Sequence, residues 1–273
     1  MQNRSAVRRD FGDRDALQNR SAEEGELFTL SLRVLGLSQQ PVYATPCLSI
    51  LQQIGTQDPS LLIAAMGAAA RRLDLGAPYA NSALLVLVRF VNNFPQKVLP
   101  WLPTLTEAVL RCLEPSDPVL RRSSLSAATS ALFELVKTFP MVTFHQITQR
   151  FAVGTTTGLI VIYDLRTATK WRILEGHTGR VSCLAFSEDG NHLASYSAGD
   201  RSIRTWQCGS TGFFGGLLGM SGKCLKAHSL PATKVAGVFN SPVHQLQTIS
   251  LSWTARNELR LVREDGRLYI LRM

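Results

Sequence analysis

The chain has 273 residues, is 45% hydrophobic and carries a formal net charge of +9. That length suits one large domain or two ordinary ones, and the composition is that of a folded soluble protein. No apolar run approaches the roughly 20 residues of a membrane-spanning helix, and the charged N-terminus lacks the apolar core of a secretory signal. The five scattered cysteines form no metal-ligand spacing. We therefore expect a cytoplasmic protein with reduced thiols and with no metal and no other cofactor.

Residues 1–25 repeat Gln-Asn-Arg-Ser-Ala among alternating Arg and Asp residues. They offer almost nothing to bury, so we predict a disordered tail. From residue 26 to residue 140 the apolar residues recur at helical spacing, and prolines separate the helices because proline cannot continue a helix interior. The predicted helices are 27–37, 44–57, 59–73, 78–93, 102–113 and 118–138.

An internal repeat lies within this helical region. Residues 83–95 can be laid on residues 128–140 at an offset of 45, and both segments end in Phe-Pro. A period of about 40–47 residues is typical of HEAT and armadillo units, whose helix pairs stack into an α-solenoid. An irregular helical bundle is the alternative.

Near residue 141 the apolar period changes from 3.6 to 2, and we place a domain boundary there. Short apolar runs separated by Asp, Asn and Gly predict β-hairpins over 141–273. The predicted strands are 143–147, 150–155, 159–164, 170–174, 181–186, 192–197, 202–206, 223–227, 234–239, 246–252, 258–263 and 267–272.

One four-strand unit opens with Gly176-His177 and closes with Trp206-Gln207. This pattern resembles a WD-repeat, one blade of a β-propeller, with Gln in place of the usual Asp. Tyr163-Asp164 stands 43 residues earlier, which indicates a preceding blade, and residues 234–272 are read as a degenerate third. The predicted fold is thus α+β in two domains, a solenoid followed by about three blades of an incomplete propeller.

In WD-repeats a histidine, a strand hydroxyl, a turn aspartate and a tryptophan form a hydrogen-bonded set. The resemblance places this set at His177, Ser195 or Ser197, Asp200 and Trp206. Such a set would give the buried imidazole and indole N–H groups their partners. The alternatives are a catalytic or metal pair of His177 with Asp200, or a hydrolase triad that adds Ser195. We expect the structural role and no enzyme.

Closed propellers have about 4–8 blades, so three would leave two open sheet edges and an open inner face. We therefore expect the remaining blades to come from elsewhere in a longer protein. Aromatic anchors for a protein partner would be Trp171, Tyr196, Phe213 and Phe214, each alternatively a packing residue. Phe213 and Phe214 lie in the glycine-rich stretch 209–222, which we read as a long loop.

The positive charge is uneven. Residues 143–273 carry 15 Lys and Arg against 8 Asp and Glu. A basic half allows binding to nucleic acid or to an acidic membrane surface. However, the positive residues are dispersed, without a Lys/Arg run or an aromatic platform, so no nucleic acid is expected and an acidic protein partner fits better.

Three segments, Ile162-Tyr-Asp-Leu-Arg166, Trp171-Arg-Ile-Leu-Glu-Gly-His177 and Ile203-Arg-Thr-Trp206, follow the helical region. Together with it they resemble the C-terminal part of rabconnectin-3 beta-like WD-repeat proteins over residues 40–273. The resemblance implies a large cytoplasmic scaffold that joins a rabconnectin-3 alpha-like subunit. It also implies association with the vacuolar proton ATPase on vesicle membranes, promotion of its assembly, and membrane contact only through partners. It brings no small-molecule substrate and no catalytic residues.

Overall fold

The computed structural model describes residues 23, 25–33, 41–58, 60–61, 76–209, 223–231, 249–255, 257–263 and 265–272. The chain forms two compact units, Met1–Leu87 and Val88–Met273. Several predictions lie outside the described residues. They are nearly all of the tail 1–25, most of the helix 59–73, the strand 234–239 and the loop with Phe213 and Phe214.

The first unit is helical wherever it is described. Residues 25–33 form a helix, α2 spans Pro41–Gln57, and α4 spans Gly76–Asn93 and continues into the second unit. Phe28, Leu32 and Leu51 are almost wholly buried and form part of its core. α2 begins earlier than the predicted residue 44 and holds a proline inside it. No helix among the described residues is long and apolar enough to cross a membrane.

The second unit begins with short helices and ends with sheets. α5 (Pro95–Val98) and the 3-10 helix η1 (Leu99–Trp101) were not predicted, whereas α6 (Leu102–Arg111) and α7 (Pro118–Thr138) were. α7 starts where predicted because the Asp117 carboxylate accepts a hydrogen bond from the Leu120 amide at 2.9 Å and Pro118 suits the first turn.

The 45-residue repeat marks two helix ends. α4 and α7 both stop just before Phe-Pro, and in each case the Phe amide donates to the carbonyl four residues earlier, Phe94 to Phe90 and Phe139 to Leu135. After that the two segments differ, since Pro95 opens α5 and Pro140 leads into a strand. Stacking of such helix pairs into a solenoid stays a prediction.

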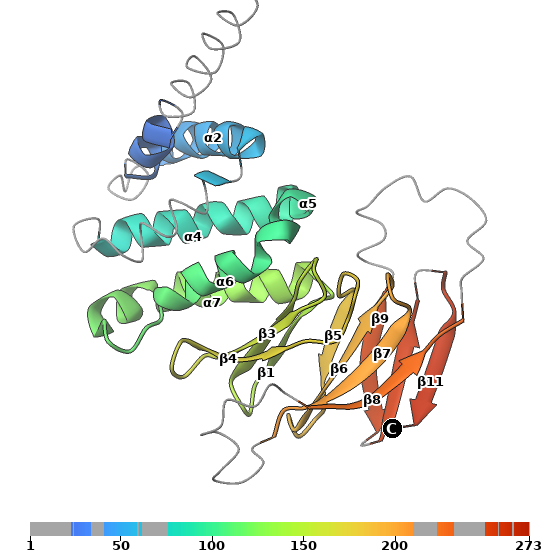
Figure 1. Ribbon diagram of the computed structural model, residues 1–273. Coiled ribbons are helices and arrows are strands. Elements are labelled where there is room, and N and C mark those ends of the chain that lie inside the picture. The colour runs from blue at the N-terminus through green and yellow to red at the C-terminus, as the bar shows by residue number, and fades with distance from the viewer. Residues whose placement is uncertain are drawn as a thin grey trace, which may run out of the picture. The chain divides into compact units, whose positions relative to one another are not determined.

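The strands form three antiparallel sheets (Figure 1). The first two are four-stranded meanders in the order β1-β2-β3-β4 and β5-β6-β7-β8, and the third is β9-β10-β11 among the described residues. This arrangement fits an incomplete propeller. The bounds are β1 Val142–His145, β2 Arg150–Gly154, β3 Ile160–Asp164, β4 Thr169–Leu174, β5 Cys183–Phe186, β6 His192–Ser197, β7 Ser202–Gln207, β8 Cys224–Ser229, β9 Ser250–Ala255, β10 Glu258–Val262 and β11 Leu268–Arg272.

The three sheets stack in chain order. β5 lies between β1 and β9, so the first strands of the sheets are neighbours. The Leu184 amide donates to the Pro140 carbonyl at 3.0 Å, and the Trp253 indole donates to the Ala185 carbonyl at 3.1 Å. Apolar side chains fill the interface between the second and third sheets, among them Tyr196, Ile203 and Leu259.

Helices cover the outer face of the first sheet. β3 is buried along its whole length, and α6 and α7 lie against β2, β4 and β1 of this sheet (Figure 1). The Tyr163 hydroxyl donates to Glu107 of α6 at 3.2 Å, and Lys170 forms an ion pair with the same carboxylate at 2.9 Å. The helices that precede the first blade thus supply cover for one of its faces.

Candidate functional site

The second sheet brings together four of the residues predicted for the hydrogen-bonded set. His177 Nδ1 lies 2.9 Å from Asp200 Oδ2, and His177 Nε2 lies 2.7 Å from Ser195 Oγ. The Trp206 indole donates to the same Ser195 oxygen at 2.7 Å. Ser195 sits at the middle of β6 and Trp206 near the end of β7, so strand pairing fixes their separation. A continuous chain of hydrogen bonds thus ties the loop before β5 to β6 and β7.

Asp200 anchors the turn between β6 and β7. Its Oδ2 also accepts from the Thr178 amide at 3.0 Å, and its Oδ1 accepts from the Ser202 hydroxyl at 2.8 Å and the Ser202 amide at 3.0 Å. The two serines that were candidates for one role therefore differ in what they bind. Ser195 bridges the two rings, whereas Ser197 only accepts a long 3.4 Å contact from the Asp200 amide.

The protonation states follow from these partners. Burial lowers the pKa of His177 below its usual value, and the hydrogen bond and charge of Asp200 oppose that shift without cancelling it. Burial alone would raise the pKa of Asp200, but the hydrogen bonds from Ser202, His177 and the Thr178 amide outweigh it and lower the pKa. A neutral His177 then donates from Nδ1 to the carboxylate and accepts at Nε2 from the Ser195 hydroxyl.

The order Ser195, His177, Asp200 is that of a nucleophilic triad, but access to solvent is missing. Ser195 is 0% exposed, and its oxygen already accepts from the Trp206 indole. A nucleophile must reach its substrate, so this geometry holds the blade together instead. Among the described residues, no three His, Cys, Asp or Glu side chains gather as metal ligands.

The neutral state of His177 predicts a pH dependence of folding. The pKa of His177 is lower in the folded chain than in the unfolded chain, where it is about 6.5. The stability that neutral His177 contributes to folding is therefore fully present above that pH. This stability is lost as the pH falls below about 6.5, since His177 is then protonated in the unfolded chain but stays neutral in the folded chain. The measurement is the urea unfolding free energy at several pH values. In His177→Gln this part of the slope should disappear; an unchanged slope contradicts the prediction.

Gly176 touches the ring of Trp206. A Cβ at Gly176 would lie 2.9 Å from Trp206 Cη2 and 3.2 Å from Arg204 Nη1. The indole is 1% exposed and hydrogen-bonded, so it cannot yield easily. Gly176→Ala should lower the unfolding free energy by about 1–3 kcal/mol, as overpacked cores do. Glu175→Ala, at the neighbouring exposed position, is the matched control and should change little.

Of the predictions for partner-binding aromatic residues, the one for Tyr196 was wrong. Its side chain is 0% exposed and packs in the interface between the second and third sheets, where it cannot meet a partner. Phe213 and Phe214 lie outside the described residues. Trp171 is partly exposed on β4, the outer strand of the first sheet.

Two arginines lie against Trp171. The guanidinium carbons of Arg150 and Arg172 are 3.7 and 4.3 Å from the centre of the indole. Arg150 Nη1 donates to the Cys208 carbonyl at 2.6 Å, and Arg172 Nη1 to the Gln207 carbonyl at 3.4 Å. These contacts fix both cations between the first and second sheets.

Two further hollows lie on the second unit. One, of about 460 Å³, is lined by the turns after β1 and β5 and by the end of β9, and includes Glu188, Asp189 and Trp253. Hydrogen bonds from Ser187 and Asn191 lower the pKa of Asp189 to about 2. The other, of about 430 Å³, is an apolar groove between α7 and the first sheet, where Phe133 is 64% exposed.

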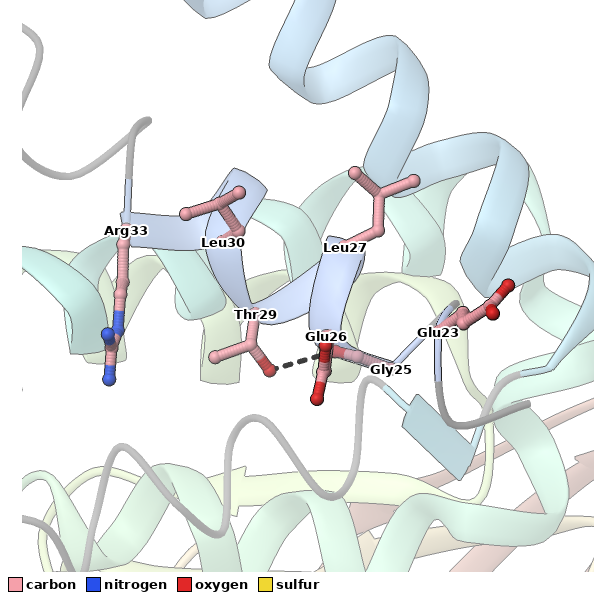
Figure 2. A pocket seen from close by; sticks show the side chains of 7 residues that line it. All are labelled: Glu23, Gly25, Glu26, Leu27, Thr29, Leu30 and Arg33. Carbon is pink, nitrogen blue, oxygen red and sulfur yellow. Dashed lines mark hydrogen bonds between the residues drawn. The ribbon is translucent and has the colours of Figure 1, made fainter. Parts of the chain in front are cut away.

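The first unit has a hollow of about 700 Å³, shown in Figure 2. All the described residues that line it come from one helical stretch, from Glu23 to Arg33. The dashed line in Figure 2 marks the bond from the Thr29 hydroxyl to the Gly25 carbonyl at 3.0 Å, which is local to that helix. Among the described residues, the lining offers no convergent polar groups from several elements, as ligand sites do.

Three contributors to these sites were missed in the sequence. Ser202 contacts two members of the set, since its hydroxyl donates to Asp200 Oδ1 and also lies 3.3 Å from His177 Nδ1. Its position at the start of β7, opposite Ser197, was the available signal. Arg172 could have been noticed beside Trp171, but nothing local marks Arg150, which meets Trp171 only through the fold of the first sheet.

Residues 119–271 match the family model described as the Vps8 β-propeller, which is more than half of the chain. The chain belongs to the Vps8 β-propeller family. The Vps8 match begins in α7 and extends through the three sheets. It therefore includes the hydrogen-bonded set and the Trp171 cluster, which consists of Trp171, Arg150 and Arg172. This match does not show the narrower resemblance to rabconnectin-3 beta.

Two solved structures are similar to parts of this Vps8-type propeller chain. The β-propeller domain of Cps50 (Swd1) from Myceliophteria thermophila is 17% identical, with a TM-score of 0.36, and the match covers 50% of this chain and 34% of that one. The computationally designed Ika4 protein is 20% identical, with a TM-score of 0.33, and the match covers 48% of this chain and 64% of that one. The chain thus spans about a third of the first structure and less than two thirds of the second.

Proposed function

We propose that this chain is a non-enzymatic scaffold for protein–protein interaction, and that its propeller is completed by further blades. The observation that carries the proposal is the outer face of the third sheet. Leu251, Leu259 and Leu261 point to the second sheet and are buried, whereas Leu268 is 50% and Ile270 61% exposed. No described residue covers that second face. In a closed propeller each sheet has a neighbour on both sides.

The non-enzymatic part of the proposal is supported by the site already described. Its best-formed polar constellation is buried and serves the blade, and propeller families act mainly as binding platforms. The large apolar groove beside α7 and the pocket at the turns provide further surface for proteins.

The narrower form of the proposal follows from the sequence resemblance. The partners would be a rabconnectin-3 alpha-like subunit and the vacuolar proton ATPase, and the chain would be cytoplasmic and held at vesicle membranes through them. Immunoprecipitation of the tagged chain from solubilised vesicle membranes, probed for ATPase subunits, tests this form. Failure to enrich them would remove it and leave the general scaffold in place.

The general proposal is tested by capture of blades. The tagged chain is mixed with separately produced blades of a Vps8-type β-propeller, and complex formation is measured by analytical ultracentrifugation. We expect a one-to-one complex that Ile270→Asp weakens at least about tenfold, since a buried charge at an interface costs more than 1.4 kcal/mol. Val119→Asp, at a 77% exposed position on α7, is the matched control. Equal binding by both variants, or no complex at all, would overturn the proposal.

A further inference from the structure

The Trp171 cluster holds two positive charges close together. β4 has a bulge in its pairing with β3, where Ile162 faces Arg172 and Tyr163 faces Lys170, so Trp171 has no partner across the strands. The bulge presents the indole to Arg150 at the start of β2 and to Arg172 next along β4. An aromatic face attracts a cation, and a positioned guanidinium presents a fork of donors.

These two charges have no carboxylate partner among the described residues. Asp164, the nearest acidic residue on the first sheet, is held by Arg166, whose Nη2 and Nε lie 2.6 and 3.0 Å from its two oxygens. Lys170 is paired with Glu107 at 2.9 Å. Four cations therefore gather here, and only Arg166 and Lys170 are neutralised.

Of the two remaining cations, Arg150 is in the less favourable environment for a positive charge. Its Nε is buried without a hydrogen-bond partner. Burial lowers the pKa of Arg150, the positive charge of Arg172 lowers it further, and the negative charge of Asp164 only partly offsets this. An anion placed between Arg150 and Arg172 would relieve their repulsion and satisfy donors that are already in position.

We propose that Arg150, Trp171 and Arg172 form a binding site for a carboxylate side chain in an acidic segment of a partner protein. The proposal rests on the scaffold function and gives the chemistry of one of its partners. Two arginines that both lie against one indole offer forked donors of the kind that an Asp or Glu carboxylate accepts.

An acidic peptide fits the cluster better than a nucleic acid or a membrane. Membrane attraction through charge needs clusters of about 4–8 basic residues, and nucleic-acid binding grows with the number of phosphates neutralised. Here Asp164 and Glu107 neutralise the flanking cations and leave only two. A compact pair with one aromatic ring recognises one or two carboxylates.

The experiment measures binding of a fluorescein-labelled peptide, Gly-Glu-Leu-Glu-Leu-Glu-Gly, to the full chain by fluorescence anisotropy. The same peptide with Gln in place of Glu serves as its neutral counterpart. We expect binding of the Glu peptide only, weakened about tenfold or more by Arg172→Gln. Arg172→Lys should recover part of it, because the charge returns without the planar fork. Arg122→Gln, an exposed cation on α7, changes the net charge equally and should have no effect.

Two further arms separate the alternatives, namely single-stranded oligothymidine and phosphatidylserine vesicles. Absence of Glu-peptide binding, equal weakening by Arg122→Gln and Arg172→Gln, or Arg172-dependent binding of only the oligonucleotide or the vesicles would each overturn the proposal. Circular dichroism checks that the variants remain folded. Because blade capture depends on Ile270 and peptide binding on Arg172, failure of one assay does not imply failure of the other.

Discussion

Trp206→Ala is expected to lower the free energy of unfolding of the sheet-bearing unit by about 3–5 kcal/mol, the range for deleting a buried aromatic side chain. The indole is 1% exposed, and it fills the space between Gly176 and the centre of the second sheet. Its loss would also remove the donor to Ser195. The measurement is urea unfolding followed by circular dichroism, since the substitution removes a fluorophore.

Trp206→Phe separates the two contributions of that side chain. Phenylalanine keeps most of the apolar volume and loses only the N–H, so we expect a smaller cost of about 1–2 kcal/mol. A Trp206→Ala variant no less stable than Trp206→Phe would show that the ring does not hold the blade together, and the structural reading of the site would then be wrong.

Asp200→Ala should cost about 3 kcal/mol, since four donors, most of them partly buried, would lose their acceptor at once. These are His177 Nδ1, the Thr178 amide, and the amide and hydroxyl of Ser202. The Asp200 side chain is 10% exposed, so water can replace it only in part. Urea unfolding at neutral pH measures the loss.

Asp200→Asn gives a second readout that a general loss of packing would not produce. The negative charge of Asp200 is what raises the pKa of His177 against the effect of burial. Removing that charge while keeping the shape should therefore lower the pKa of His177 further, which NMR titration of the imidazole can measure. A His177 pKa that rises or stays constant in Asp200→Asn would contradict the electrostatic role assigned to this pair.

The strands and the hydrogen-bonded set could be predicted because their determinants are local. His177 and Trp206 are 29 residues apart and belong to one sheet, so alternation and turn residues suffice to place them. The pattern could not choose between Ser195 and Ser197, which lie on the same face of β6. Only the strand register places Ser195 opposite Arg204 and within reach of both rings.

What covers each sheet could not be predicted in the same way. A period of 2 tells which residues share a face, but it does not tell which element lies against that face. Tyr196 was a candidate for partner binding, and the third sheet buries it completely. Likewise, no local pattern indicated that α6 and α7 would lie against the first sheet, through contacts such as Tyr163 with Glu107.

The sequence alone therefore determined the change from helices to antiparallel meanders, the blade signature and the places of His177, Asp200 and Trp206 in it, because each depends on spacing within one structural unit. Only the tertiary structure decided the neighbours of the sheets and the pairing of Arg150 with Trp171. Those contacts join different elements, such as Arg150 with the carbonyl of Cys208, 58 residues away. Contacts at that separation depend on how whole sheets pack, which no local pattern of residues encodes.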